Sequence, residues 1–222
     1  MRMMEGLSER LRIEADYIWT RILEHPFVLE LYEGSLPLEK FTYYVIQDYN
    51  YLIGMMRAYS ILASKAEYEL ARLALEIAHL DATTEMENYR KLLDRMGLDL
   101  HEVMMVEPAP TNMAYMNHLL ATAVLGEPMD ILVATLPCFW SYLEIGERHR
   151  DLLRRNQNEL YRSWAEVYLT DEYEELVRRL RGIIDGLWKG CEYERYRGIF
   201  TTSSRYEWMF WEMAYKLECW PP

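Results

Sequence analysis

The chain has 222 residues, with 24 Lys and Arg against 36 Asp and Glu, and therefore a formal net charge of −12. Apolar residues make up 51% and charged residues 27%, so the chain can bury a large core and is not intrinsically disordered. The acidic balance disfavours non-specific binding to nucleic acid or to anionic membrane surfaces.

The first twelve residues contain no apolar core of the length that a signal peptide needs. The sequence contains no run of about 18 uninterrupted apolar residues, so it predicts no membrane-spanning helix. The three cysteines, Cys138, Cys191 and Cys219, are too few and odd in number for a secreted disulfide scaffold. Cys191 and Cys219 lie near predicted helix ends and are compatible with free thiols or with a bridge between them. A cytoplasmic location is therefore expected.

Helical periodicity runs along almost the whole chain. Apolar residues at i+3 and i+4 steps predict a helix from about Leu38 through Tyr59, followed by a helix over about 67–96 that stops near Gly97. Thr111 is a candidate N-cap for a helix that runs to about Leu125. His25, before a proline, is expected to cap the end of the first helix.

Further helices are expected at 129–153, with Pro137 inside it, and at 159–168, 171–188 and 205–218. The last opens with Ser204-Arg-Tyr-Glu207, which fits an S-x-x-E capping box. No βαβ alternation, glycine-rich phosphate loop or repeat is present. The sequence predicts an all-α fold: one domain over residues 1–222, a bundle of seven or eight helices.

Asp48 is the first residue that breaks the apolar pattern. It occupies the apolar stripe of its predicted helix, and Tyr51 lies on the same side three residues later. A buried, unpaired carboxylate costs several kcal/mol, so a cation, a hydrogen-bonded cluster or a ligand must compensate. The alternative is an aspartate at the edge of the stripe that is solvated, or paired with an arginine or tyrosine.

Cys138 follows Pro137, which removes a backbone hydrogen bond and distorts the helix where the thiol appears. Tyr142, at i+4, stands on the same helix face. A lone cysteine in an apolar helix is more often inert packing than a nucleophile. The neighbouring proline and tyrosine make a nucleophilic role for Cys138 a hypothesis worth testing.

Glu207 has two interpretations. As the third residue of the capping box, it bonds back to Ser204. It also begins a stripe that continues through Phe210 and Trp211, which places its carboxyl beside aromatic rings. A carboxyl among apolar groups acts as a general acid or base near neutral pH. The spacing alone leaves both interpretations open.

Acidic helical bundles often hold two iron ions, so a metal centre is an alternative. The chain has one Glu-x-x-His pair, Glu76 and His79, with suitable i,i+3 geometry. A ferritin-like site needs two such pairs, and no other histidine follows a glutamate at this spacing. We therefore expect no metal, and a haem-oxygenase-like di-metal oxidase remains the alternative function.

Five segments occur in an order and spacing typical of one family: His25-Pro-Phe-Val28, Gly34-Ser-Leu-Pro-Leu-Glu-Lys-Phe41, Gln47-Asp-Tyr-Asn-Tyr-Leu52, Leu136-Pro-Cys-Phe-Trp-Ser-Tyr-Leu-Glu-Ile-Gly146, and Ser204-Arg-Tyr-Glu-Trp-Met-Phe-Trp-Glu-Met-Ala-Tyr215. The chain resembles the TenA/thiaminase II family, in its cysteine-containing branch. The resemblance implies a haem-oxygenase-like bundle without haem or another cofactor.

The resemblance also implies roles for individual residues. The nucleophilic cysteine of the family falls on Cys138 and its acid/base glutamate on Glu207. The remaining positions form the substrate-binding set, in which the pyrimidine-binding carboxylate falls on Asp48, the pocket tyrosines on Tyr51, Tyr115, Tyr142 and Tyr168, and the stacking phenylalanine on Phe210.

The implied activity is a hydrolase of thiamin salvage or degradation that acts on an aminopyrimidine: hydroxymethylpyrimidine, aminomethylpyrimidine or thiamin itself. The sequence leaves open whether thiamin or its degraded pyrimidine is the physiological substrate. A non-catalytic aminopyrimidine-binding protein of the same fold is a further alternative. High aromatic content and 14 methionines favour a homo-oligomer, and the family resemblance implies a tetramer.

Overall fold

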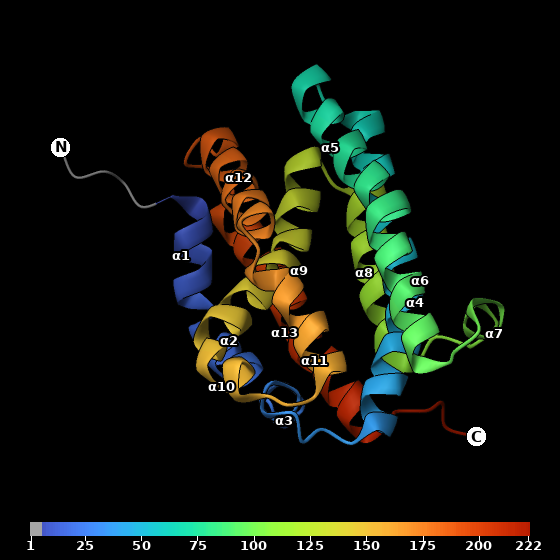
Figure 1. Ribbon diagram of the computed structural model, residues 1–222. Helices are drawn as coiled ribbons and strands as arrows, with labels where there is room; N and C mark the ends of the chain where they lie inside the picture. Colours follow the sequence, from blue (N-terminus) through green and yellow to red (C-terminus); the bar gives the residue numbers. More distant parts are fainter. Residues whose placement is uncertain (1–5) are drawn as a thin grey trace. The chain divides into compact units, whose positions relative to one another are not determined.

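The computed structural model describes residues 6–222, and the first five of the twelve residues considered for a signal peptide lie outside this range. No β-strand occurs between residues 6 and 222, so the prediction of an all-α fold is confirmed. The chain divides into two compact units. The first contains the chain up to Leu36 together with Leu132–Glu212, and the second contains Pro37–Ile131 with Met213–Pro222. Figure 1 traces the helices along the chain.

The elements follow one another with short connections. Those that lie wholly or mostly in the first unit are α1 (Leu7–Glu14), α2 (Asp16–Leu23), α3 (Pro26–Glu33), α9 (Pro128–Arg148), α10 (Arg150–Arg155), α11 (Glu159–Glu166), the 3₁₀-helix η2 (Val167–Leu169), α12 (Asp171–Leu187) and α13 (Tyr193–Lys216). Those of the second unit are α4 (Leu38–Lys65), α5 (Tyr68–Leu80), the π-helix η1 (Asp81–Glu85), α6 (Met86–Met96), α7 (Leu100–Met104) and α8 (Pro110–Leu125).

The number of helices is higher than predicted because several long predicted helices are divided. The helix expected over 129–153 ends at Arg148 and restarts as α10. The helix expected over 67–96 is interrupted by the π turn η1, and it ends as predicted at Gly97, whose φ of +69° suits a glycine.

Two predicted caps are wrong. His25 does not end the first helix; it is the N-cap of α3, and its ring Nδ1 accepts the Phe27 N–H at 3.1 Å. Thr111 is not the N-cap of α8, because Ala109 occupies that position and Thr111 already lies in the first helical turn. In both cases an adjacent proline starts the helix one position away from the expected cap.

The largest difference concerns the last helix, which begins at Tyr193 instead of residue 205. The added turns contain Thr-Thr-Ser-Ser, a run of weak helix formers that favoured a boundary at Ser204. Packing overrides that preference. Phe200 is fully buried and its ring stacks on that of Trp19 at 5.9 Å, and the Trp19 indole N–H donates to the Ser204 hydroxyl at 3.0 Å.

In the second unit, α4 and α8 lie side by side (Figure 1). Lys65, at the end of α4, donates from Nζ to three backbone carbonyls at the end of α8, at distances of 2.8, 2.6 and 2.8 Å. A helix leaves its last carbonyls without backbone partners, and a cation there also opposes the negative end of the helix dipole. Lys65 therefore caps α8 from another helix.

We expect Lys65→Met to lower the free energy of unfolding by about 1–2 kcal/mol, because the carbonyls lose a charged donor. Thermal melts and urea titrations measure the change. Lys91→Met is the control, since Lys91 is exposed and pairs only with Glu87 on its own helix. Equal stabilities of the Lys65 variant and the parent would contradict the capping role.

The π turn carries two partly buried carboxyls, those of Asp81 and Glu85. Burial, together with the smaller effect of the negative charge of Glu85, raises the pKa of Asp81 from 3.8 to about 7. Burial also raises the pKa of Glu85. The folded chain thus holds a proton on Asp81 up to about pH 7, whereas the unfolded chain releases it near pH 4.

Because the folded state binds this proton more tightly, the contribution of Asp81 to stability falls as pH rises from about 4 to about 7. We expect Asp81→Asn to raise the melting temperature relative to the parent at pH 8 and to leave it nearly unchanged at pH 4. Glu76→Gln, at an exposed position of α5, is the control. The prediction fails if the Asn variant and the parent differ equally at both pH values.

Candidate functional site

The second unit places three of the predicted site residues on two neighbouring helices. Asp48 and Tyr51 come from α4, and Tyr115 comes from α8. The rings of Tyr51 and Tyr115 are 5.1 Å apart and tilted by 43°, and both side chains are buried. Asp48 is partly buried, one helical turn before Tyr51. The two tyrosines are therefore neighbours, as the prediction of a shared pocket requires.

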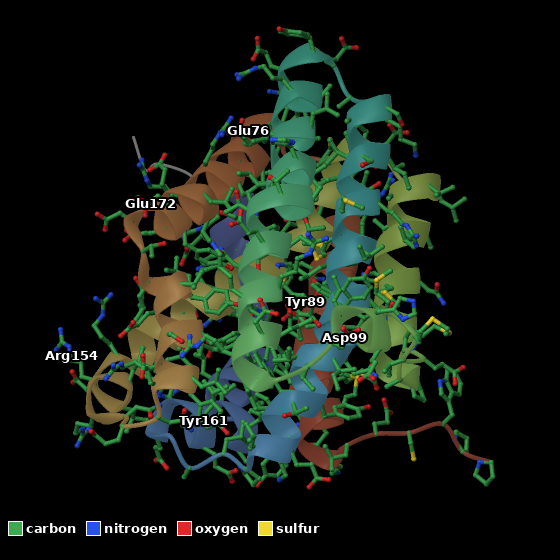
Figure 2. All side chains as sticks on the ribbon, turned by 45° about the vertical axis from the view of Figure 1, so that its right-hand side comes forward. Glu76, Tyr89, Asp99, Arg154, Tyr161 and Glu172 are labelled. Carbon is green, nitrogen blue, oxygen red and sulfur yellow. The ribbon has the colours of Figure 1, made fainter. Side chains whose placement is uncertain are left out.

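Tyr89 of α6 is a neighbour of Asp48 that the sequence analysis missed. Its hydroxyl donates to the backbone carbonyl of Val45 at 2.7 Å, so the ring projects from α6 toward α4; Figure 2 labels it. Burial raises the pKa of Tyr89, and the negative charge of Asp48 adds to this effect. The Tyr89 ring also lies 6.0 Å from that of Tyr49. No local motif marks Tyr89, because its contact with α4 is set by the packing of α6.

In the first unit, α9 carries Cys138 and Tyr142 one turn apart, as predicted. Pro137 lies inside this helix, so one backbone hydrogen bond is missing immediately before the cysteine. Cys138 is partly buried, and Tyr142 is 8% exposed. Cys191 and Cys219 are both exposed and are not joined in a disulfide.

Tyr142 belongs to an aromatic cluster. Its ring lies 4.7 Å from that of Tyr168, 5.2 Å from that of Trp211 and 6.1 Å from that of Trp164. Tyr173 extends the cluster, at 5.2 Å from Tyr168. The predicted pair Tyr142 and Tyr168 is thus brought together, and Trp164, Trp211 and Tyr173 join it. The cluster offers several flat aromatic faces close to the thiol-bearing helix.

The cluster is also linked to the backbone beside the cysteine. The Tyr173 hydroxyl donates to the carbonyl of Phe139, the residue after Cys138, at 3.0 Å. This bond ties α12 to α9 at the position of the thiol. Trp164 had a spacing signal, since it precedes Tyr168 by four residues, whereas Tyr173 had none.

The structure excludes one of the two interpretations of Glu207. Since α13 begins at Tyr193, both Ser204 and Glu207 lie in the interior of the helix, and the capping-box prediction is wrong. Glu207 is 3% exposed, and Phe210, three residues later, is 4% exposed. A carboxyl at this depth in the middle of a helix has no capping function, and the acid/base role of Glu207 stays a prediction.

The eight candidate residues divide between the two units. Asp48, Tyr51 and Tyr115 belong to the second unit. The first unit contains the other five, which are Cys138, Tyr142, Tyr168, Glu207 and Phe210. Within each unit, aromatic candidates are in contact. The convergence of Asp48, Cys138 and Glu207 on one substrate stays a prediction.

Two hollows lie in the first unit, and the smaller one is lined in part by Tyr142, Trp164 and Trp211 of the aromatic cluster. One, of about 200 Å³, is lined almost entirely by apolar and aromatic side chains and is too narrow for a water molecule. The other is an open groove of about 760 Å³ whose lining includes Trp140 and Glu144 of α9. Those residues lie on a different face of α9 from Cys138 and Tyr142. The lining of the groove includes none of the eight candidate residues, and its Arg12 is already bound to Glu144.

The metal alternative finds no support in the geometry. Glu76 and His79 are both exposed on α5. Between residues 6 and 222, no three side chains of the His, Cys, Asp or Glu types are grouped to hold a metal ion. In the same part of the chain, no helix has both the length and the apolar character that a bilayer crossing requires.

The chain belongs to the TENA/THI-4/PQQC family, whose pattern matches residues 12–217. Among its relatives are aminopyrimidine aminohydrolases from Halalkalibacterium halodurans, 34% identical over 93% of this chain and 94% of the relative, and from Bacillus subtilis, 32% identical over 96% and 91%.

Solved structures agree with this assignment. A TenA homologue from P. horikoshii OT3 is 49% identical, with a TM-score of 0.94 over 96% of this chain and 99% of the other. A domain of unknown function with a haem-oxygenase-like fold from Shewanella denitrificans is 14% identical, with a TM-score of 0.77 over 97% and 94%. The second comparison shows the fold alone, and it confirms the haem-oxygenase-like architecture that the resemblance implied.

Proposed function

We propose that this chain is an aminopyrimidine aminohydrolase of thiamin salvage that replaces an amine on the pyrimidine methylene carbon with water. The observation that carries the proposal is the burial of Glu207 in the interior of α13, on a chain in which the family resemblance assigns the nucleophilic cysteine to position 138. Relatives that bear this name match it over more than nine-tenths of its length. We treat both units as one functional domain, residues 1–222.

Asp48 and the aromatic residues bind the ring in this proposal. A 4-aminopyrimidine presents a ring nitrogen and an exocyclic amine side by side, and a carboxyl group that shares one proton with the ring nitrogen and accepts from the amine bridges this edge with two hydrogen bonds. Phe210, Tyr142 and Tyr168 supply aromatic faces for stacking, which is worth about 1–3 kcal/mol per base in nucleic-acid complexes. Tyr51 and Tyr115 complete the proposed pocket.

Cys138 is the proposed nucleophile. Its thiolate forms a bond to an electron-poor ring carbon, and the displaced ring electrons expel the amine from the methylene carbon. Glu207 supplies the proton that the leaving amine takes. Water then adds to the methylene carbon and returns a proton to Glu207, and the thiolate leaves the ring. The sum is one water consumed and one ammonia released.

Carboxylates close to a thiol raise the thiol pKa, so Asp48 and Glu207 oppose thiolate formation in the empty site. We therefore propose that Cys138 loses its proton only when substrate is bound, to Glu207 directly or through a tyrosine. This order protects the thiol from oxidation between turnovers.

Two assays in parallel test the function: ammonia release from an aminomethylpyrimidine, and cleavage of thiamin. Ammonia release that saturates with the pyrimidine supports the proposal, and thiamin cleavage at a comparable kcat/KM extends it to thiamin. Binding of the pyrimidine without ammonia release would identify a non-catalytic binding protein instead. Absence of both would overturn the proposal.

We also propose that the chain acts as a cytoplasmic homotetramer. The second unit exposes large apolar side chains on α5 and at the end of α8, with Tyr68 at 75%, Leu75 at 58% and Leu125 at 84% exposure. Such side chains favour an interface between copies. Sedimentation analysis at micromolar concentration is expected to give four times the 26.7 kDa of one chain; a mass of 26.7 kDa would refute the assembly.

A further inference from the structure

The start of α8 is held by residues far away in the chain. Its N-cap residue, Ala109, has no side-chain acceptor, and the first helical residue is proline. The Ala109 N–H instead donates to Oε1 of Gln47 at 2.8 Å, and the Thr111 N–H donates to the carboxylate of Glu218 at 2.9 Å. The first turn of α8 is therefore capped by α4 and by the C-terminal segment.

Gln47 and Asn112 form a buried amide pair between α4 and α8. Gln47 is 3% exposed and Asn112 is fully buried. Nδ2 of Asn112 donates to the backbone carbonyl of Gln47 at 2.7 Å and to its Oε1 at 3.0 Å. Nε2 of Gln47 donates to the carbonyl of Glu107 at 3.3 Å. Gln47 thus binds both Asn112 and the segment that starts α8.

Buried amides define a helix register more sharply than apolar contacts do. Between the amide pair and Lys65, the same two helices meet through aromatic or apolar contacts, as between Tyr51 and Tyr115 and between Gly54 and the side chain of Met116. Such surfaces tolerate a small slide, whereas a slide at the amide pair leaves buried polar atoms without partners, at about 1–3 kcal/mol each.

The pair is also not the best choice for stability alone. Oδ1 of Asn112 is buried and has no hydrogen-bond partner in the part of the chain that the structure describes. Two well-packed apolar residues would avoid that cost, and a buried polar pair is best explained where it sets a register. This register positions two proposed binding residues that lie close by in the sequence. Gln47 directly precedes Asp48, and Tyr115 follows Asn112 by three residues.

We propose that Gln47 and Asn112 are positioning residues that set the location of Tyr115 relative to Asp48. The inference rests on the proposed function, in which these two side chains bind one pyrimidine ring. Asp48 must meet the polar edge of the ring while Tyr115 meets the ring itself. An error of about 1 Å in such an arrangement is enough to lower catalytic efficiency by up to about 100-fold.

The test compares variants at the two ends of the same helix pair. Gln47→Met and Asn112→Leu keep side-chain volume but remove the amide bonds, and we expect each to raise KM for the aminopyrimidine about tenfold or more, with a smaller change in kcat. The double variant should resemble either single variant, because both remove one shared contact. Lys65→Met loosens the far end of the pair and is expected to lower the melting temperature without changing KM.

Gln47→Glu provides a milder change, since it keeps the acceptor for Ala109 and loses only the donor to Glu107; its KM should lie between those of the parent and Gln47→Met.

Calorimetric binding of hydroxymethylpyrimidine supplies a readout besides activity. Parental KM and affinity in the amide variants, or an equal rise in KM in Lys65→Met, would overturn the inference. If the parent binds the pyrimidine but releases no ammonia, the catalytic proposal is refuted. The binding measurements on the amide variants still test the register. A parent that does neither overturns both.

Discussion

Cys138→Ala is expected to lose at least about 100-fold in turnover with an aminomethylpyrimidine, because the covalent step has no other nucleophile in the proposed mechanism. Cys138 is partly buried on α9, and the change to alanine removes one sulfur atom, so the fold should persist. Single-turnover ammonia release measures the chemical step directly. Substantial activity in this variant would exclude covalent catalysis by Cys138.

The two exposed cysteines give matched controls. Cys191→Ala and Cys219→Ala remove thiols of the same chemistry from positions outside the proposed site and should keep parental turnover. In a chain that lacks both, alkylation by iodoacetamide reports on Cys138 alone. We expect its rate to change when hydroxymethylpyrimidine is bound. Equal rates with and without the pyrimidine would count against deprotonation that depends on substrate.

Glu207→Gln is expected to lower turnover by about 100- to 10,000-fold, the range in which a positioned acid/base group contributes. The substitution keeps the shape of a side chain that is 3% exposed in the interior of α13. The amide neither donates a proton to the leaving amine nor accepts one from water. The pH profile of kcat should therefore lose the limb that reports on this carboxyl, which a purely structural effect would not remove.

Glu212→Gln is the control on the same helix. Its carboxylate contacts the buried ring of His25 at 3.1 Å, and an amide oxygen still accepts that hydrogen bond. Turnover close to that of the parent is expected. If Glu207→Gln instead lowers only the melting temperature, with an unchanged kcat, the glutamate has a packing role and the proton transfers belong to another group.

The helical content and the reactive side chains followed from local patterns. Periodicity predicted α4 and α9, and an i,i+4 spacing placed Cys138 and Tyr142 on one face of α9. Such relations depend only on helix geometry. The candidate role of Asp48 likewise came from a polar residue in an apolar stripe, and the structure shows this side chain partly buried.

The sequence by itself determined that the chain is all-α, which family it resembles and which side chains carry reactive groups, because periodicity and spacing act within one helix. Only the tertiary structure decided that Glu207 is no cap, since the packing of Phe200 on Trp19 holds α13 helical for eleven residues ahead of Ser204. Tyr89 and the pair of Gln47 and Asn112 were equally beyond prediction. Their hydrogen bonds join residues that lie 44 and 65 positions apart in the chain, and no local propensity specifies which distant residues meet.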